Sequence, residues 1–381
     1  MMDALQTTNG VALSLAKRLT PNDLHSLWEK TNSTATDILN EAILETSKSL
    51  NKKGIVSVPL YSGETDHYPN DPSNYLISGK IKNGTPLAES SYKRDIFIVK
   101  AGSLARNTLM PGSDIDFLVF PSNKESIPYA QALQKEIAFK LKKIIDEREL
   151  PFKVDEIMSE INDFHVPPEE AKEKLLQPTR QTYDPEFNMS WSTPSIMPTI
   201  LRDIEFVYGD RGSFNRLQEA SKARLVTPQT CQDSIALEIT RDLLEGPLRE
   251  KLQALNIRLS NGSTIQDFDP KDDGTRVVEL FTWLVRAKTG IEDKNPLEVI
   301  KATNSLTKDE QQKLEAVFKF LVMLTAAARK AEPYVREGEH PKLTSDNEEK
   351  FATILGIETP LLRRLLIEHL TATHEIISNH T

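Results

Sequence analysis

Apolar residues recur at helical spacing toward both ends of the chain. Between residues 13 and 53, leucine and isoleucine recur three or four positions apart, and the polar stretch TNSTATD separates two such groups. Serine and threonine are common helix N-cap residues, so the pattern predicts two helices in this range. From about residue 194 onward, the same spacing predicts helices near 196–223, 233–256, 275–289, 307–332, 345–355 and 359–378.

The middle of the chain instead alternates short apolar runs with one long helical pattern. The segments DIFIVKAGS (95–103), SDIDFLVF (113–120) and FKVDEI (152–157) have the length and apolar content of strands. Between the last two, residues 126–149 repeat apolar positions on one helical face. The sequence therefore predicts an α+β fold, in which a small mixed-sheet core is flanked by helices and followed by a mostly helical C-terminal domain.

These patterns divide the chain into four regions. Residues 1–55 are expected to form N-terminal helices that pack on the core, and residues 56–94 a polar insertion or loop, because turn-forming residues fill 61–93. Asp66 and His67 in that stretch are interpreted as solvated side chains rather than ligands. Residues 95–232 are expected to form the core with its following helices, and residues 233–381 the helical domain.

Composition narrows the classes of partner. The chain has 381 residues, 38% of them apolar, and a formal net charge of -9, which disfavours nonspecific binding to a nucleic acid backbone and leaves a protein as the favoured macromolecular partner. The single cysteine, Cys231, excludes an internal disulfide framework and a cysteine zinc site. No apolar run reaches the length of a membrane span, and the N-terminus lacks the pattern of a signal peptide, so a cytoplasmic location is expected.

Two aspartates lie one residue apart at the start of a predicted strand. Alternate strand positions point to the same face, so Asp114 and Asp116 are expected to project together. Adjacent carboxylates repel each other unless a cation lies near them. Mg²⁺ (or Mn²⁺) takes one or two carboxylates together with substrate phosphates, so the pair predicts a metal-bound nucleotide.

A third acid is expected from the neighbouring strand 152–157. Asp155 and Glu156 face opposite ways in a strand, so only one of them can join the pair, and Asp155 is favoured over Glu156. Gly102 and Ser103 at the end of the first strand could admit and bind anionic oxygens, and Arg106 could reach a phosphate.

The stretch AGSLARNTLMPGSDIDFLVF (101–120) resembles the signature of the nucleotidyltransferase superfamily. In spacing it is most similar to the bifunctional uridylyltransferases that modify the nitrogen-signalling protein PII. The shared positions are Gly102, Ser103, Arg106, Leu109, Pro111, Ser113, Asp114, Ile115 and Asp116. The resemblance implies catalytic and metal-binding roles for Asp114, Asp116 and Asp155, and nucleotide contacts at Gly102, Ser103, Arg106 and Ser113. Ala105 and Thr108 depart from it, where the family has glycine and glutamate.

The resemblance extends over about residues 35–360, outside the insertion. The segment TILRDIEFVYGDRGSFNRL (199–217) resembles a family segment in which one helix ends at a Gly-Asp-Arg turn and another follows; Gly209 is a plausible helix C-cap and Asp210 an N-cap. The segment DPKDDGTRVVELFTWLVRAKTG (269–290) resembles a glycine-rich family stretch that has lost most of its glycines. Gly274, Arg276 and Trp283 remain, whereas Asp269 stands in place of the family lysine.

The phosphohydrolase and ligand-sensing domains of those uridylyltransferases are not expected here. No His-Asp dipeptide occurs among its seven histidines, so no hydrolytic half is expected. His369, His374 and His380 do not have the spacing of a metal site on one helix face and are interpreted as surface residues.

The resemblance implies transfer of a nucleoside monophosphate from a nucleoside triphosphate such as ATP or UTP to an acceptor hydroxyl, with release of pyrophosphate. A protein side chain is the favoured acceptor. Two alternatives remain: a nucleotidyltransferase that acts on RNA or makes a nucleotide second messenger, and a regulatory module that binds nucleotide without catalysis.

Overall fold

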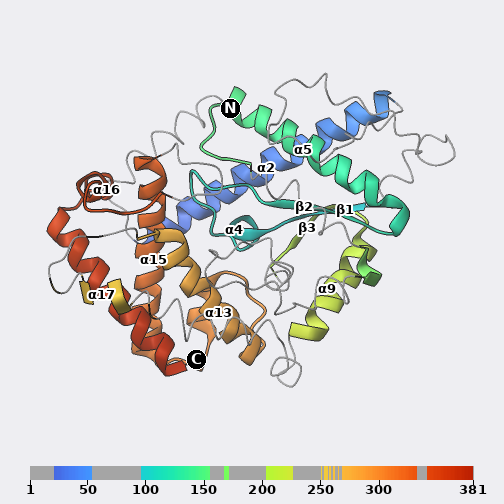
Figure 1. The fold of residues 1–381 in the computed structure, drawn as a ribbon. Coiled ribbons are helices and arrows are strands. Elements are labelled where there is room, and N and C mark those ends of the chain that lie inside the picture. Colours follow the sequence, from blue (N-terminus) through green and yellow to red (C-terminus); the bar gives the residue numbers. More distant parts are fainter. Residues whose placement is uncertain are drawn as a thin grey trace.

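The α+β fold expected from the sequence is confirmed by a computed structural model of the chain (Figure 1). The structure describes residues 21–53, 96–154, 167–170, 203–225, 268–332 and 341–380, together with residues 250, 253–255, 257–258, 261 and 265. The whole predicted insertion 56–94 lies outside these residues, as do Asp155, Glu156 and Cys231. Within the described ranges, none of the helices combines the length and apolar character that crossing a membrane requires.

A three-stranded sheet forms the centre of the molecule. Its strands are β1 (Ile96–Lys100), β2 (Phe117–Pro121) and β3 (Glu205–Gly209), in the order β2-β1-β3, and β1 is antiparallel to both neighbours. The parallel pairing that a mixed sheet requires is confined, among the described residues, to one bridge between Asp114 and Lys153. The predicted strand 152–157 is therefore seen only at its beginning.

Strand β3 corrects a prediction, because a helix was expected over 196–223. Residues Glu205–Gly209 instead pair with β1, and helix α9 (Arg211–Leu225) follows. A short apolar run can form either element, and here the free edge of β1 selects the strand. Gly209 ends this strand rather than a helix: its φ is +98°, and a Cβ there would lie 2.3 Å from the Ile96 carbonyl oxygen. The N-cap prediction is confirmed, because Asp210 Oδ1 accepts the Gly212 and Ser213 amides at 2.9 and 3.2 Å.

The first described helix, α2 (Pro21–Lys53), is a second correction, because one helix replaces the two that were predicted. The polar stretch in the middle of α2 does not cap the start of a second helix. Asn32 Nδ2 donates to the Trp28 carbonyl at 2.7 Å, and Thr34 Oγ1 donates to the Lys30 carbonyl at 2.9 Å. A polar side chain that donates to the carbonyl one turn earlier has its hydrogen bond within the helix and does not interrupt it.

Helices cover both faces of the sheet (Figure 1). Ile96, Ile98 and Val119 pack against α2 and the long helix α5 (Ile127–Glu147), which confirms the helix predicted at 126–149. Side chains of alternate strand positions form the other core with α9, where the rings of Phe97 and Phe120 stack at 5.1 Å. This alternation is the period-2 pattern of a sheet buried on both faces.

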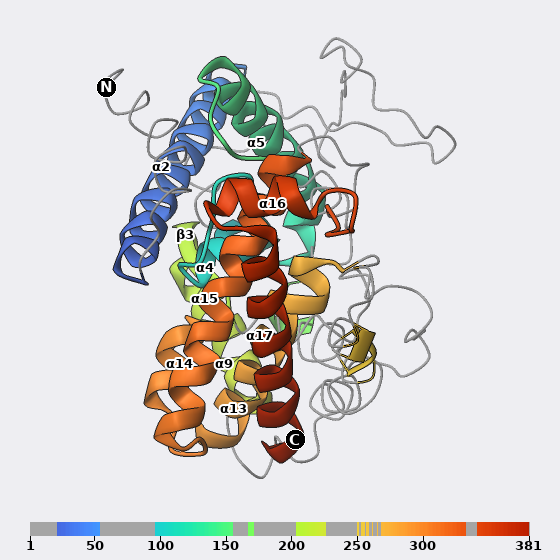
Figure 2. The ribbon, with the colours of Figure 1, turned by 90° about the vertical axis from the view of Figure 1, so that its left-hand side faces the viewer.

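The C-terminal half is helical, as predicted. It contains α13 (Arg276–Thr289), α14 (Pro296–Ala302), α15 (Lys308–Ala331), α16 (Glu348–Leu355) and α17 (Thr359–His380), of which only the short α14 was not predicted. In Figure 2, α13, α14, α15 and α17 lie below α5, and α16 lies at the level of α2. The helix predicted at 233–256 falls almost entirely outside the described residues.

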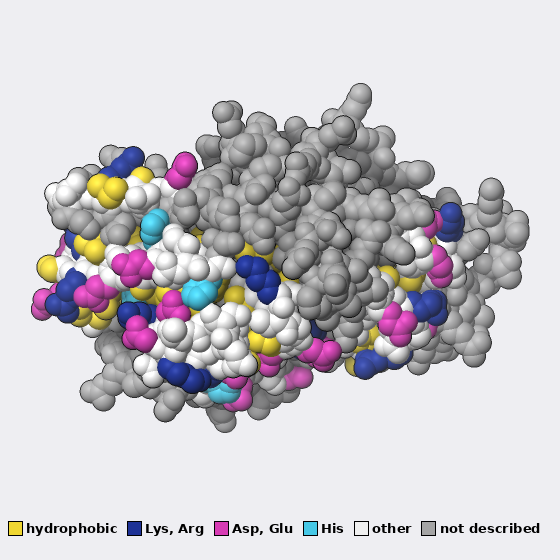
Figure 3. Space-filling view, turned by 90° about the horizontal axis from the view of Figure 1, so that it is seen from below, with side chains coloured by type: hydrophobic (Ala, Val, Ile, Leu, Met, Phe, Trp, Pro, Cys, Tyr) yellow, Lys and Arg dark blue, Asp and Glu magenta, His cyan; other side chains and the backbone are white. Residues whose placement is uncertain are grey.

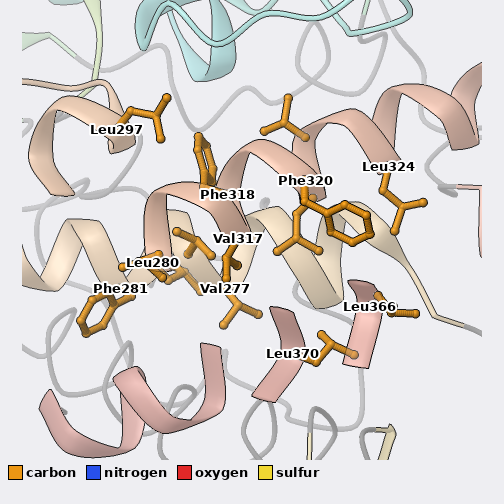
Figure 4. Close-up of a cluster of buried hydrophobic side chains, with 14 of the residues drawn as sticks. Val277, Leu280, Phe281, Leu297, Val317, Phe318, Phe320, Leu324, Leu366 and Leu370 are labelled. Atoms are coloured by element: carbon orange, nitrogen blue, oxygen red, sulfur yellow. The ribbon is translucent and has the colours of Figure 1, made fainter. Parts of the chain in front are cut away.

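One apolar core unites the helical half. Figure 4 shows Val277, Leu280 and Phe281 of α13 next to Val317 of α15, with Leu366 and Leu370 of α17 nearby, whereas Phe318 of α15 points toward Leu297 of α14. Leu27 and Trp28 of α2 belong to the same core, and the Trp28 ring lies 6.3 Å from that of Phe318. Farther along, the same helix packs on the sheet, so α2 buries one end in each half of the molecule.

Candidate active site

A cavity of about 200 Å³ lies between the sheet and the helical half. From the sheet side, residues that follow β1 and precede β2 line it, among them Gly102, Ser103, Asp114 and Asp116. From the helical side, Lys271, Arg276 and Arg329 line it, together with apolar residues of α13 and α15. The predicted carboxylates therefore face a set of cations from a distant part of the sequence.

The two aspartates lie immediately before β2, whose first residue is Phe117. The Ile115 amide between them donates to the Lys153 carbonyl at 2.9 Å, and the Lys153 amide donates to the Ser113 carbonyl at 3.1 Å. This pairing extends the backbone, so successive side chains point to opposite faces and Asp114 and Asp116 share one face. Ile115 is buried in the core, whereas Asp114 and Asp116 both line the cavity, as predicted.

The Gly-Ser turn forms a short helix, α4 (Gly102–Ala105), whose first residue lies against Asp116. Gly102 has a φ of +54°, and a Cβ there would lie 2.0 Å from Asp116 Oδ2. The glycine is thus needed to seat the Asp116 carboxylate, in addition to any contact with nucleotide. The Thr108 amide donates to the Ser103 carbonyl at 2.9 Å and closes the turn that follows α4.

Ser113 links the aspartate segment to the helical half. Its Oγ accepts the Met110 amide at 3.2 Å and lies 2.5 Å from Arg329 Nη1 of α15. The nucleotide contact predicted for Ser113 remains a prediction. In this structure the hydroxyl holds an arginine that lines the same cavity.

Arg106 lies at the border of the cavity but is held by carboxylates. Its Nη2 lies 3.0 Å from Glu279 Oε1, and its Nη1 lies 3.7 Å from Asp203 Oδ2. Asp203 Oδ1 in turn accepts from Arg286 Nη1 at 2.5 Å. The phosphate contact predicted for Arg106 stays a prediction, and this structure shows the guanidinium in ion pairs instead.

The cations of the helical half were not predicted as site residues. Lys271 lies in η5 (Pro270–Thr275), a π-helical segment that runs directly into α13, and Arg276 Nε lies 3.1 Å from Asp272 Oδ1. Burial lowers the pKa of Lys271, and the nearby Arg276 and Arg329 lower it further. Burial also lowers the pKa of Arg329, whereas Asp114 and Asp116 raise it. Desolvated cations of this kind interact strongly with an anion that enters the cavity.

Asp269 precedes η5 as its N-cap. Its carboxylate accepts the Lys271 amide at 2.8 Å and the Asp272 amide at 3.0 Å. Burial, followed by the charge of Asp272, raises the pKa of Asp269 to about 6. Asp269 therefore acts as a structural cap of η5.

The carboxylate pair fits a hard divalent cation. Two carboxylates that face one cavity suit Mg²⁺, which completes its shell with water and substrate phosphate oxygens. In the part of the chain that the structure describes, no group of three histidine, cysteine, aspartate or glutamate side chains is placed to hold a metal ion. Asp203 lines the cavity but is paired with two arginines. The predicted third acid, Asp155, follows the described residue 154 directly.

Comparison with protein families agrees with this arrangement. Residues 87–179 match the family model described as a nucleotidyltransferase domain. The matched range contains the Gly-Ser turn, the two described aspartates and Asp155. No curated protein matches the chain. The family match supports a domain of the nucleotidyltransferase superfamily in this segment of the chain.

Proposed function

We propose that the protein is a Mg²⁺-dependent nucleotidyltransferase that transfers a nucleoside monophosphate from a nucleoside triphosphate to a hydroxyl group on a protein. One observation carries the proposal: Asp114 and Asp116 line one side of a cavity whose other side carries Lys271, Arg276 and Arg329. Acids that suit a metal and cations that suit a polyphosphate are the two requirements for binding a metal–nucleotide complex.

Asp114, Asp116 and Asp155 are proposed to hold the metal. When bound, Mg²⁺ would supply charge neutralisation at the triphosphate and would favour the ionised form of an acceptor hydroxyl. Asp155 is also the proposed base that accepts the proton of that hydroxyl. This assignment rests on its position in the chain, two residues after the Lys153 bridge to Asp114.

The remaining residues are proposed to bind and orient the nucleotide. Gly102 and Ser103 lie against the carboxylate pair, where their turn can approach the β- and γ-phosphates. Lys271, Arg276 and Arg329 would stabilise the negative charge that accumulates on the departing pyrophosphate. In the reaction, the acceptor oxygen bonds to the α-phosphorus, the bond from that phosphorus to the bridging oxygen of the β-phosphate breaks, and pyrophosphate leaves.

A protein acceptor is favoured over RNA by the charge of the molecule. The net charge of the chain is -9, and on the face shown in Figure 3 the described acidic and basic side chains are interspersed rather than gathered into a basic stripe. An RNA acceptor would be expected to bind a basic groove.

The test is to incubate the protein and Mg²⁺ with each α-labelled nucleoside triphosphate in a cell lysate. The Asp114→Asn/Asp116→Asn variant is run in parallel, and Asp309→Asn, which removes an exposed acid of α15, is the matched control. A labelled protein band that is lost only in the double variant supports the proposal and identifies the nucleotide. Label in RNA or in a small molecule would change the acceptor. Nucleotide binding with no transfer would establish a noncatalytic module.

A further inference from the structure

Arg106 connects the two halves that form the cavity. It directly follows α4, and its amide donates to the Gly102 carbonyl at 3.2 Å. Its side chain reaches across to α13, where Nη2 lies 3.0 Å from Glu279 Oε1. Only 18% of the Arg106 side chain and 21% of the Glu279 side chain are exposed, so solvent screens this pair weakly.

A second carboxylate anchors the same guanidinium. Asp203 lies just before β3, with Oδ2 3.7 Å from Arg106 Nη1 and Oδ1 2.5 Å from Arg286 Nη1. Arg286 is seven residues after Glu279, which places the two on one face of α13, two turns apart. The network thus joins the end of α4, the start of β3 and two turns of α13.

The charges in this network oppose a phosphate ligand at Arg106. Its guanidinium already faces two carboxylates, and an incoming phosphate would have to displace one of them or lie beside both. Lys271 and Arg329 also line the cavity. Among the described residues, neither of them has two carboxylates at ion-pair distance, as Arg106 does. They are better placed to receive an anion.

The position of the network suggests what it does. On the sheet side, Arg106 ends the turn whose Gly102 seats the Asp116 carboxylate. On the helical side, Glu279 lies one turn after Arg276, which lines the cavity. The ion pair therefore lies between a metal-binding carboxylate and a cation of the proposed phosphate site.

We infer that Arg106 is a positioning residue, which fixes the separation between the carboxylate pair and the cations through Glu279 and Asp203 and does not bind phosphate. This inference rests on the proposed function. It reassigns a residue that the sequence motif alone would place on the nucleotide.

The decisive comparison is between Arg106→Gln and Glu279→Gln. If Arg106 bound phosphate, removing Glu279 would free the guanidinium and preserve or tighten nucleotide binding. If Arg106 positions the two halves, the loss of either partner has the same effect. We expect both variants to lower the rate of protein labelling at saturating nucleotide by about tenfold or more, because small displacements of reacting groups have large effects on rate.

Nucleotide affinity provides the second measurement. Calorimetric titration with Mg·ATP and Mg·UTP is expected to show dissociation constants within about threefold of the wild-type values in both variants. The reason is that both variants keep the residues proposed to bind the metal and the phosphates. The Glu298→Gln variant, which breaks an exposed ion pair with Lys301 on α14, is the matched control and should leave rate and affinity unchanged. An affinity loss of about tenfold in Arg106→Gln, with none in Glu279→Gln, would overturn the inference.

A third measurement does not depend on turnover. Hydrogen exchange of the Arg106 and Thr108 amides, which bond to the Gly102 and Ser103 carbonyls, reports directly on the stability of the turn. Both variants are expected to accelerate this exchange about tenfold, and the control should not. If the wild-type protein neither binds nucleotide nor labels any acceptor, the proposed function fails; unchanged exchange in both variants would refute the positioning role whichever way the transfer experiment ends.

Discussion

The Arg329 guanidinium lies 2.5 Å from the Ser113 hydroxyl, although 216 positions separate the two residues in the sequence. The contact joins α15 to the residue that precedes Asp114. Gly112 lies against this arginine, since a Cβ at that position would be in ordinary van der Waals contact, at 3.4 Å, with both Cβ and Cδ of Arg329. The aliphatic part of the arginine therefore passes over Gly112, and its charged end reaches the carboxylate segment.

Replacement of this arginine is expected to weaken nucleotide binding. The Arg329→Gln change removes a desolvated charge from the cavity, and charge-assisted hydrogen bonds contribute about 1.5–3 kcal/mol, so the dissociation constant of Mg·NTP should rise roughly tenfold to a hundredfold. Titration calorimetry measures this shift. Lys330→Gln makes the same charge change at the adjacent exposed position and should have no effect. Equal affinities for the two variants would exclude Arg329 from the site.

Gly102→Ala is expected to abolish transfer by displacing Asp116. The new Cβ would lie 2.0 Å from Asp116 Oδ2, and the φ of +54° is unfavourable for alanine. Gly290→Ala is the matched control, because its φ is +74° but nothing lies within 4 Å of the added Cβ. Both variants should lose about 1 kcal/mol of stability from the backbone conformation. Only Gly102→Ala should lose transfer activity, as measured by labelling from the α-labelled nucleotide. Full activity in that variant would show that transfer does not depend on the present position of the Asp116 carboxylate.

The sequence predicted the residues of one side of the site and not those of the other. Asp114 and Asp116 were predicted because strand alternation and their spacing are local properties. Lys271 and Arg329 carry no local signal of this kind. They approach the aspartates only because η5 and α15 pack against the sheet side, and packing between distant segments cannot be read from periodicity.

The errors in secondary structure have the same origin. The stretch EFVYG was predicted to be helical, and it became β3 because β1 offers an edge with which it can pair. Asn32 and Thr34 were interpreted as a break between two helices, and their side chains instead bond within one helix. In both cases the local residue types allow either structure, and tertiary contacts decide between them.

The Asp269→Asn variant should change the pH dependence of stability. Because burial raises the pKa of Asp269 from 3.8 to about 6, the folded protein holds this proton more tightly than the unfolded chain does. The protonated Asp269 carboxyl therefore contributes fully to the stability of the fold below its unfolded-state pKa of 3.8. This contribution is lost as the pH rises through the folded-state pKa of about 6. Asparagine cannot ionise but keeps an oxygen that can accept the Lys271 and Asp272 amides.

We expect the variant to be more stable than the wild type above pH 6, by at most about 3 kcal/mol, with the difference disappearing below pH 3.8. Urea denaturation at several pH values measures it. A difference that is constant across this range would show that the ionisation of Asp269 is not responsible.

Asp203→Asn tests how strongly the buried network holds the halves together. The change leaves Arg106 and Arg286 without the negative charge between them, and only 4% of the Arg286 side chain is exposed. Breaking a buried ion pair by neutralising one partner costs about 3–5 kcal/mol, because the remaining charge stays desolvated.

The control is Asp309→Asn, which breaks the pair with Lys313. The Asp309 side chain is 71% exposed and that of Lys313 54%, and exposed pairs contribute about 0–1 kcal/mol. Urea denaturation should therefore separate the two variants by about 2 kcal/mol or more, with unchanged slopes. Similar stabilities would mean that water reaches the Asp203 carboxylate and that the network does not hold α13 against the sheet.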